Sequence, residues 1–343
     1  MSILERAFNK RKDDNVSSTS ESVEASNVRY IDSGSDGFDT ISEDHRVIQQ
    51  RDMGGFDALI AHGDDGNTIG DILEKSGALT REQVEDTLRL QDEENLYFGE
   101  AALKLKYVTH EELNFALARQ YGYEYLTPDN ASMSKELISV YKPFSKKTEA
   151  LRAVRSALIV NVLDKGHQVM AILSPGKGEG KSYTAANLAI LFSQLNKKTL
   201  LIDANFRSPR QHEIFNFDPR IGLSAILGGR LSREGFEKLP ETLEAFSNVS
   251  LLGSGPIPPN PSELLGNPRL KMFLKQLRNI YDIIIIDTPS AEYKADVQFV
   301  SQCVDIAVVV CRKNRTSIST YKNLLGFCSH INLPVAGVIY NEF

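Results

Sequence analysis

The segment SPGKGEGKS, residues 174–182, follows an apolar run and precedes a helical pattern. Its glycines let backbone N–H groups turn inward around phosphate oxygens, and the helix behind it would point its positive end at the same anion. Lys181 is expected to reach the terminal phosphates, and Ser182 to offer its hydroxyl to Mg²⁺. Pro175 stands where the general phosphate-loop pattern has a glycine. The segment therefore predicts a variant phosphate-binding loop.

Two apolar runs further along the chain each end in an aspartate. The run TLLID ends at Asp203 and is followed by Asn205 and Arg207, and the run YDIIIID ends at Asp287. Ligands bind at the carboxyl edge of parallel strands, so we expect both carboxylates beside the loop, where an acidic group orders water on Mg²⁺. The metal-holding residues would be Ser182, Asp203 and Asp287.

The second half of the chain predicts the fold that carries this loop. Short apolar, β-branched runs alternate with amphipathic helical stretches from about Glu149 onward. This pattern is typical of α/β proteins with a mostly parallel sheet, helices on both faces and right-handed crossovers. We therefore expect a P-loop NTPase-like α/β domain over residues 149–343, preceded by a linker over residues 128–148.

The segments before the linker differ in composition. Residues 1–66 are rich in Ser, Asp, Glu and Gly and poor in periodic apolar residues, which predicts a flexible acidic arm. Residues 67–127 contain an internal repeat, in which TIGDILEKSGALTREQVEDTLRLQ recurs as YFGEAALKLKYVTHEELNFALARQ. The repeat predicts a small all-helical domain built from two similar halves.

Each copy of the repeat predicts a helical hairpin. A threonine precedes the second helix and a Gln or Glu follows three residues later, as Thr80 with Gln83 and Thr109 with Glu112. This is the reciprocal capping pattern that satisfies backbone donors at a helix start. The apolar residues expected to face the core are Val84, Leu88, Leu113 and Leu117.

The repeat resembles the N-terminal domain of type II secretion and type IV pilus assembly ATPases, some of which bind cyclic di-GMP. Ligand-binding members open each copy with Arg-Leu-Gly, whereas these copies open with Thr-Ile-Gly at 68–70 and Tyr-Phe-Gly at 97–99. Both arginines are missing, and Lys106 stands where the first copy has Gly77. We favour a structural or docking module and keep cyclic di-GMP as the alternative.

Charge and hydropathy limit the remaining classes. The 45 acidic and 39 basic residues give a formal charge of −6, which does not indicate a nucleic-acid surface. No apolar run has the ~18 to 20 residues that span a bilayer, and the first residues lack the apolar stretch of a secretory signal. We expect a cytoplasmic protein with packed, reduced thiols at Cys303, Cys311 and Cys328.

From Glu149 onward the chain resembles the bacterial tyrosine kinases of polysaccharide export. The shared motifs are, in the family's order, EALRAVRSAL, the loop ending in GEGKS, LLIDANFRSP, GLSAILGG, GPIPPNPSELLGNPRL, YDIIIIDTP and GVIYN. The resemblance implies an ATP-dependent protein tyrosine kinase that also phosphorylates itself and regulates exopolysaccharide biosynthesis, chain length and export. It implies ATP and Mg²⁺ as cofactors.

The resemblance also implies roles for single residues. Asp203 would receive the proton of the tyrosine hydroxyl besides helping to hold Mg-ATP. The catalytic residues would be Lys181, Asp203, Asp287 and Arg207. The nucleotide-binding residues would be Gly176, Lys177, Gly178, Glu179, Gly180, Lys181, Ser182 and Tyr183.

A helix at the start of this region resembles the one that joins neighbouring kinase subunits into a homo-oligomeric ring. Glu149, Arg152 and Arg155 match the family's Glu-x-x-Arg-x-x-Arg pattern. The alternative is a solvated helix face with charge pairs three residues apart.

The chain departs from the family in three places. Asn205 replaces the second aspartate of Asp-x-Asp-x-Arg and brings no charge to Mg²⁺. Lys177 replaces a proline and is expected to add at most a phosphate contact. The chain stops at Phe343, soon after Tyr340, where family members continue into a tyrosine-rich tail. Autophosphorylation would use other tyrosines, with Tyr30, Tyr121, Tyr123 and Tyr125 as candidates.

We expect a separate membrane partner, because many family members carry membrane segments and a periplasmic chain-length domain that this sequence lacks. The cytosolic tail of that chain-length-determinant partner would complete the nucleotide site and hold the kinase at the inner membrane. Two alternatives remain. One is a catalytically weak P-loop ATPase scaffold, favoured by Asn205 and the absent tail. The other is a partition-type positioning ATPase, against which stand the spacing of Lys177 and the GPIPPNPSELL run.

Overall fold

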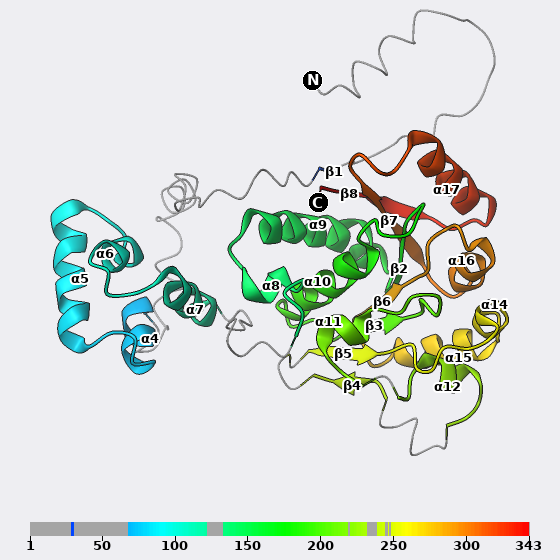
Figure 1. Ribbon diagram of the computed structural model, residues 1–343, viewed down its shortest axis with the longest axis horizontal. Helices are drawn as coiled ribbons and strands as arrows, with labels where there is room; N and C mark the ends of the chain where they lie inside the picture. Colours follow the sequence, from blue (N-terminus) through cyan, green and yellow to red (C-terminus); the bar gives the residue numbers. More distant parts are fainter. Residues whose placement is uncertain are drawn as a thin grey trace, which may run out of the picture.

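The computed structural model describes residues 68–121, 133–218, 220–231, 239–243, 246 and 248–342, together with the backbone of Arg29 and Tyr30. The arm expected at 1–66 lies outside the described residues except for those two, which form the short strand β1 (Arg29–Tyr30). Figure 1 shows two groups of elements, the helices α4 to α7 and a sheet with helices on both faces.

The described part of the chain forms an eight-stranded sheet in the order β1-β8-β7-β2-β6-β3-β5-β4. The strands after β1 are β2 (Val169–Leu173), β3 (Thr199–Asp203), β4 (Glu241–Thr242), β5 (Val249–Leu252), β6 (Ile283–Asp287), β7 (Ile306–Arg312) and β8 (Val335–Asn341). Neighbouring strands run parallel, except that β4 is antiparallel to β5. The α/β class and the mostly parallel sheet are therefore confirmed.

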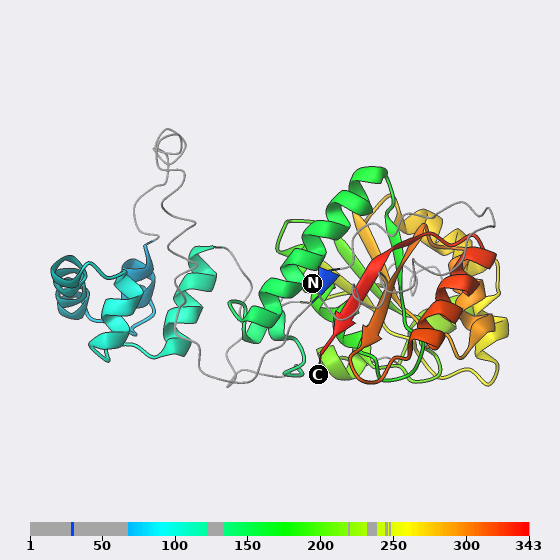
Figure 2. The ribbon, with the colours of Figure 1, turned by 90° about the horizontal axis from the view of Figure 1, so that it is seen from above.

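Both faces of the sheet are apolar, because alternate residues of a strand point to opposite sides. In β2, Met170 and Ile172 belong to one core and Ala171 and Leu173 to the other. The first core is covered by α8 (Ile138–Tyr141), α9 (Lys146–Asn161) with the turn η2 (Leu163–Lys165), α10 (Lys181–Ser193) and α11 (Gln211–Phe215). The second is covered by α12 (Leu223–Leu227), α14 (Pro261–Leu265), α15 (Arg269–Leu277), α16 (Lys294–Ser301) and α17 (Ile318–His330). Figure 2 shows the two helical layers from above.

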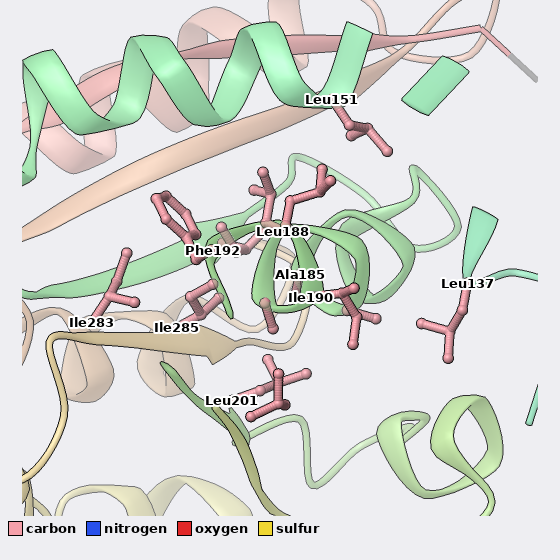
Figure 3. Close-up of a cluster of buried hydrophobic side chains, with 14 of the residues drawn as sticks. Leu137, Leu151, Ala185, Leu188, Ile190, Phe192, Leu201, Ile283 and Ile285 are labelled. Atoms are coloured by element: carbon pink, nitrogen blue, oxygen red, sulfur yellow. The ribbon is translucent and has the colours of Figure 1, made fainter. Parts of the chain in front are cut away.

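Helix α10 packs against the middle of the sheet and is buried on nearly all sides. Figure 3 shows side chains of α10, among them Leu188 and Phe192, between the strand residues Leu201 and Ile285 and the α9 residue Leu151. All five are at most 3% exposed. Since α10 begins at the glycine-rich segment, this packing fixes the position of that segment relative to the strands.

Residues 133–145 belong to the same packed unit, although the sequence assigns 128–148 to a linker. Leu137 is 0% exposed and lies in the core that contains α10. Ser139 donates its backbone N–H and its hydroxyl to Asn187 Oδ1 in α10, at 3.0 and 2.9 Å. The described part of the expected linker is thus a packed structural element. The sequence did not indicate this, because the helix α8 has four residues and is too short to show a periodic apolar pattern. The domain boundaries themselves stay a prediction.

The repeat module consists of α4 (Ile69–Lys75), α5 (Arg81–Glu94), α6 (Phe98–Lys104) and α7 (His110–Gln120). The expected caps are confirmed. The Thr80 hydroxyl accepts the Gln83 N–H while the Gln83 side chain accepts the Thr80 N–H, and Thr109 and Glu112 form the same pair. The main helix contacts join α4 to α7 and α5 to α6, so the two copies pack across each other.

Two repeated glycines allow this close packing. A Cβ atom at Gly70 would lie 3.2 Å from the ring of Phe98, and one at Gly99 would lie 3.0 Å from the side chain of Leu113. These contacts are tighter than ordinary packing tolerates, so a side chain at either position would push the helices apart. The glycines that match between the copies are therefore sites of helix approach.

The prediction that Leu88 faces the core of the module is wrong. Leu88 is 45% exposed, and the neighbouring Thr87 is 0% exposed instead. Burial of Thr87 is tolerated because its hydroxyl donates to the carbonyl of Gln83 at 2.7 Å. The other expected residues, Val84, Leu113 and Leu117, do contact the core of the module.

The three cysteines lie in the part of the chain that the structure describes. Cys311 and Cys328 are buried and Cys303 is half-buried, each as a free thiol, which confirms the expected packing. Within that part of the chain no helix combines the length and the apolar character needed to cross a membrane.

If residues 133–145 are part of the core, Leu137→Ala should destabilise the α/β unit. The substitution removes most of a fully buried side chain and leaves a cavity. We expect a loss of about 2–5 kcal/mol in the free energy of unfolding measured with urea. The matched control is Leu195→Ala, at a position 41% exposed just after α10, with an expected loss below about 1 kcal/mol. Equal losses in the two variants would contradict the packed element.

Candidate functional site

The loop between β2 and α10 has the backbone of a phosphate cradle. Gly178 and Gly180 adopt φ angles of 77° and 97°, in the left-handed region that favours glycine. Gly180 is the N-cap of α10, so the first helical turn, whose N–H groups have no acceptor within a helix, starts at the loop. The loop follows Leu173, the last residue of β2, and lies at the carboxyl edge of the sheet. This is the edge where parallel sheets bind ligands.

Lys181 turns its ammonium back over the loop. Its Nζ donates to Ser174 Oγ at 3.0 Å, and Ser174 Oγ donates to the carbonyl of Gly176 at 2.6 Å. Lys181 is 6% exposed, and this burial lowers its pKa, while the negative charges of Asp287 and Glu179 oppose the change. An anion in the loop would stabilise the charged form of this buried group.

Glu179 shapes the loop instead of facing the ligand. Its Oε2 accepts the backbone N–H of Gly176 at 3.1 Å, and its Oε1 accepts the hydroxyl of Thr316 at 2.6 Å. Asn341, at the end of β8, donates to the Glu179 carbonyl at 3.3 Å. The loop is therefore braced from β8 and from the segment after β7, through a Glu179 side chain that is buried.

The carboxylates of Asp203 and Asp287 lie at the ends of adjacent strands. Asp203 pairs with Asp287 in the parallel register of β3 and β6, and the two residues are 1% and 0% exposed. Asp203 accepts three backbone N–H groups. Its Oδ1 accepts from Asn205 at 3.0 Å, and its Oδ2 accepts from Arg210 and Gln211 at 2.9 and 3.0 Å. The expectation that the two aspartates meet beside the loop agrees with this geometry.

Burial raises the pKa of both carboxyl groups. For Asp203, the neighbouring charge of Asp287 raises the pKa further, and the three backbone N–H groups oppose the rise. For Asp287, the positive charge of Lys181 and hydrogen bonds from Ser182 and Gln211 oppose it. Two ionised carboxylates in a dry site repel each other, so a cation between or beside them would stabilise the charged forms.

The donor atoms at this edge fit Mg²⁺. A hydroxyl and two carboxylates are oxygen ligands, and Mg²⁺ is usually held by one or two carboxylates together with phosphate oxygens and water. Asp287 Oδ1 is buried and accepts no hydrogen bond from the described residues, so one oxygen of that carboxylate remains available. Ser182, Asp203 and Asp287 would therefore be the protein groups that hold the ion.

Gln211 connects the two aspartate strands to α10. Its backbone N–H donates to Asp203, and its side-chain Nε2 donates to Asp287 Oδ2 at 2.8 Å and to the Ser182 carbonyl at 3.2 Å. Gln211 is 1% exposed. Gln211 was not predicted from the sequence, because a glutamine at the start of a five-residue helix carries no local signal of a site.

The side chain of Asn205 forms hydrogen bonds within its own turn. Its Nδ2 donates to the Ser208 carbonyl at 2.8 Å, and its Oδ1 accepts the Ser208 N–H at 3.2 Å. These two bonds close the turn after β3 around a side chain that is 8% exposed. Asn205 therefore holds the turn in shape and adds no charge to the site.

Arg207 points toward α14 and α16. Its Nε donates to Asp296 Oδ2 at 2.9 Å, and its Nη2 donates to Ser262 Oγ at 3.1 Å. The guanidinium also stacks over Tyr293, with Cζ 4.6 Å from the ring centroid. The structure thus ties the turn after β3 to the opposite helical layer through Arg207, away from the two aspartates.

A cavity of about 560 Å³ opens over the loop. This volume lies in the range of small-molecule sites. Lys177 reaches across the cavity rim and donates to Ser208 Oγ at 3.0 Å, and Arg312 donates to the Gly178 carbonyl at 3.2 Å. Other lining residues are Glu136, Ile138, Ser182, Tyr183, Arg210 and Ile339. Glu136 and Arg210 form an ion pair at 2.7 Å, which ties the 133–145 segment to the site.

The sequence singled out Glu149, Arg152 and Arg155 as subunit contacts. In the structure Arg152 pairs with Glu149 on α9, and Arg155 Nη1 donates to the Leu191 carbonyl of α10 at 2.9 Å. The Arg152 side chain is 10% exposed. Both arginines therefore contact their own chain, and a role between chains stays a prediction.

The ParA family model, described as NUBPL iron-transfer P-loop NTPase, matches residues 165–342. The matched range contains the loop, both aspartate strands and every strand from β2 to β8. The tyrosine-protein kinase YwqD of Bacillus subtilis (strain 168) is 35% identical over 184 residues, which cover 54% of this chain and 76% of the relative. The chain spans between 26% and 86% of the length of the first curated relatives that it matches.

Two solved structures are similar to this chain over 60% and 66% of its length. The chimerical protein CapA2B2 has a TM-score of 0.56 and 31% identity, and the similarity covers 66% of this chain and 96% of that one. The kinase domain of the Escherichia coli tyrosine kinase ETK has a TM-score of 0.57 and 26% identity, over 60% of this chain and 79% of that one.

Removing one of the two adjacent charges should stabilise the ligand-free protein at high pH. The folded pKa values of Asp203 and Asp287 are raised, so the folded state binds protons more tightly and stability falls as pH rises from about 4 toward those values. We expect Asp287→Asn, in EDTA, to raise the free energy of unfolding relative to the parent at pH 8 and to raise it less at pH 5.

The control for this pH profile is Asp164→Asn, because Asp164 lies on the exposed turn η2. Its unfolding free energy should follow the parent protein at both pH values. A gain by Asp287→Asn that is the same at pH 5 and pH 8 would show that folding does not raise the pKa of Asp287.

Proposed function

The chain belongs to the bacterial tyrosine kinases within the ParA-type P-loop NTPases, and we propose that it binds ATP with Mg²⁺ and transfers the terminal phosphoryl group to tyrosine. The observation that carries the proposal is the register of β3 and β6, which sets Asp203 next to Asp287 beside the loop. Phosphoryl transfer depends mainly on positioning and on neutralising charge. The side chains at this edge provide groups for both.

The loop residues from Gly176 to Tyr183 are proposed to bind the nucleotide. Backbone N–H groups at the start of α10 would donate to phosphate oxygens, and the Lys181 ammonium would exchange its bond with Ser174 for a phosphate. Mg²⁺, when bound, would supply positive charge that neutralises the phosphates. The Glu179 carboxylate accepts hydrogen bonds from Gly176 and Thr316, so we assign it a role in loop shape and no contact with the phosphates.

Asp203 is our candidate for accepting the proton of the tyrosine hydroxyl. Three backbone N–H groups fix the orientation of its carboxylate before a substrate arrives. Burial and the neighbouring Asp287 raise its pKa toward the neutral range, where a general base works best. Arg207, included among the catalytic residues on the sequence, would act by fixing the turn after Asp203 through its bond with Asp296.

We propose that the kinase regulates exopolysaccharide biosynthesis, chain length and export from the cytoplasmic face of the inner membrane. The motifs shared with the polysaccharide-export kinases and the relatives named tyrosine-protein kinases support this assignment. A membrane partner of the chain-length-determinant type would bring the kinase to the membrane, and its cytosolic tail would complete the nucleotide site. The cavity beside the loop is bounded by β8 and by the 133–145 segment, and we propose that the tail binds there.

A catalytically weak ATPase scaffold of the export machinery is the second candidate. The observation that favours it is Asn205, whose amide is bonded within its own turn and brings no charge to Mg²⁺. In this function ATP binding would change assembly and no tyrosine would be phosphorylated. The relatives named tyrosine-protein kinases favour neither this candidate nor a partition-type positioning ATPase.

Phosphosite mapping tests the kinase directly. After incubation with Mg-ATP, alone and with a membrane partner's cytosolic tail, the chain should gain mass in steps of one phosphate, located on tyrosine. Lys181→Met should abolish the gain, because the buried ammonium over the loop is lost. Lys165→Met, on the exposed turn η2, is the matched control and should leave the gain unchanged. ATP hydrolysis without phosphotyrosine in either condition would favour the scaffold.

Sedimentation tests the proposed homo-oligomeric ring. If Glu149, Arg152 and Arg155 join neighbouring copies, the double variant Arg152→Ala, Arg155→Ala should sediment at the mass of a single copy. The control is Arg81→Ala, Arg89→Ala, because both of these arginines are exposed on α5. A double variant that stays folded by circular dichroism and keeps the parent mass would remove the ring.

A further inference from the structure

Gln211 is the first residue of α11, and its side chain is enclosed between the ends of β3, β6 and the start of α10. It is 1% exposed, although it is polar and carries no charge. Burying an amide without hydrogen-bond partners costs free energy, so a buried glutamine side chain is expected to form hydrogen bonds. The partners of Gln211 therefore indicate what the residue does.

The backbone and the side chain of Gln211 serve different carboxylates. The backbone N–H donates to Asp203 Oδ2 at 3.0 Å, and that aspartate also has N–H donors from Asn205 and Arg210. The side-chain Nε2 donates to Asp287 Oδ2 at 2.8 Å. The Ser182 side chain also interacts with the Asp287 carboxylate and opposes the rise of its pKa. The 2.8 Å bond from Nε2 holds Oδ2 of Asp287, so the Gln211 side chain helps to orient this carboxylate, whereas only the Gln211 backbone contacts Asp203.

Two oxygens at this point remain without a donor. Asp287 Oδ1 and Gln211 Oε1 are both buried and accept no hydrogen bond from the described residues. Since Nε2 occupies Asp287 Oδ2, the free oxygen of the carboxylate is always Oδ1. Nε2 also donates to the Ser182 carbonyl at 3.2 Å, which ties the amide to the residue that would supply the hydroxyl ligand.

We propose that Gln211 is a positioning residue for Mg²⁺, which holds Asp287 so that Oδ1 faces the ion or its bound water. The inference rests on the proposed function, in which Ser182, Asp203 and Asp287 hold Mg²⁺ with the nucleotide. Groups that orient metal ligands in this way commonly change metal affinity roughly ten- to hundredfold when they are removed. In the part of the chain that the structure describes, the Gln211 side chain bonds to Asp287 and to the Ser182 carbonyl and to no N–H group of the loop, so its effect should be specific to the metal.

The test measures nucleotide affinity as a function of Mg²⁺ concentration. A fluorescent N-methylanthraniloyl ADP is titrated into the full chain in EDTA and then across a MgCl₂ series. For Gln211→Met, which keeps the size of the side chain and removes the amide, we expect the half-saturating Mg²⁺ concentration to rise roughly ten- to hundredfold. The affinity in EDTA should stay within about twofold of the parent, since Lys181 and the loop remain.

Gln168→Met is the matched control. The Gln168 side chain likewise donates Nε2 to two carbonyls, those of Arg278 and Tyr281, but it precedes β2 at the amino edge of the sheet. Its Mg²⁺ dependence should equal that of the parent. Gln211→Asn serves as a second variant that keeps a polar amide but is one methylene too short for Asp287, and circular dichroism confirms that each variant is folded.

The outcomes separate this inference from the proposed function. If the nucleotide affinity of the parent protein does not change with Mg²⁺ concentration, both the proposed function and the role of Gln211 are overturned. A parent that responds to Mg²⁺, with Gln211→Met and Gln211→Asn responding at the same concentrations, would overturn the inference alone. An equal loss of affinity in EDTA and in Mg²⁺ would also overturn it, because a merely structural role would weaken both. Electron paramagnetic resonance of bound Mn²⁺ gives a second readout, with weaker Mn²⁺ retention expected in both Gln211 variants.

Discussion

Two carboxylates held side by side away from water are the constraint on which the ligand edge of the sheet depends. The parallel register of β3 and β6 leaves no freedom to separate Asp203 from Asp287. Each must be compensated by donors, because a buried charge without partners is strongly unfavourable. The turn after β3 and the start of α11 supply backbone N–H groups to Asp203, and α10 supplies Lys181 near Asp287. The conformation of this edge follows from that need.

Local patterns were enough to predict most of the fold. The loop, the aspartates at two strand ends and the threonine caps each depend on a few neighbouring residues, whose chemistry is the same in any protein. The apolar strands were predictable because both faces of a parallel sheet are buried, so their sequences show no polar alternation. These signals correctly indicated a mostly parallel sheet and brought Lys181, Asp203 and Asp287 to one edge.

Contacts between distant segments account for what the sequence did not reveal. Gln211 reaches Asp287 across 76 positions, and Arg207 reaches Asp296 across 89. Neither partner can be chosen from the sequence, since many carboxylates are equally distant along the chain. Burial of residues 133–145 has the same origin, because Ser139 finds its acceptor in Asn187, 48 positions away. The misjudged Leu88 differs, since α5 packs on α6 with the face that carries Thr87, and Leu88 lies outside that face.

The crossed packing of the repeat module, α4 on α7 and α5 on α6, has a consequence for its origin. Each helix of one copy has its main partner in the other copy, and Gly70 of the first copy approaches Phe98 of the second. A chain with a single copy would find that surface only in a second molecule, and its folding would then depend on protein concentration. Duplication within one chain turns such a dimer into an intramolecular fold, at an effective concentration fixed by the short connection between α5 and α6.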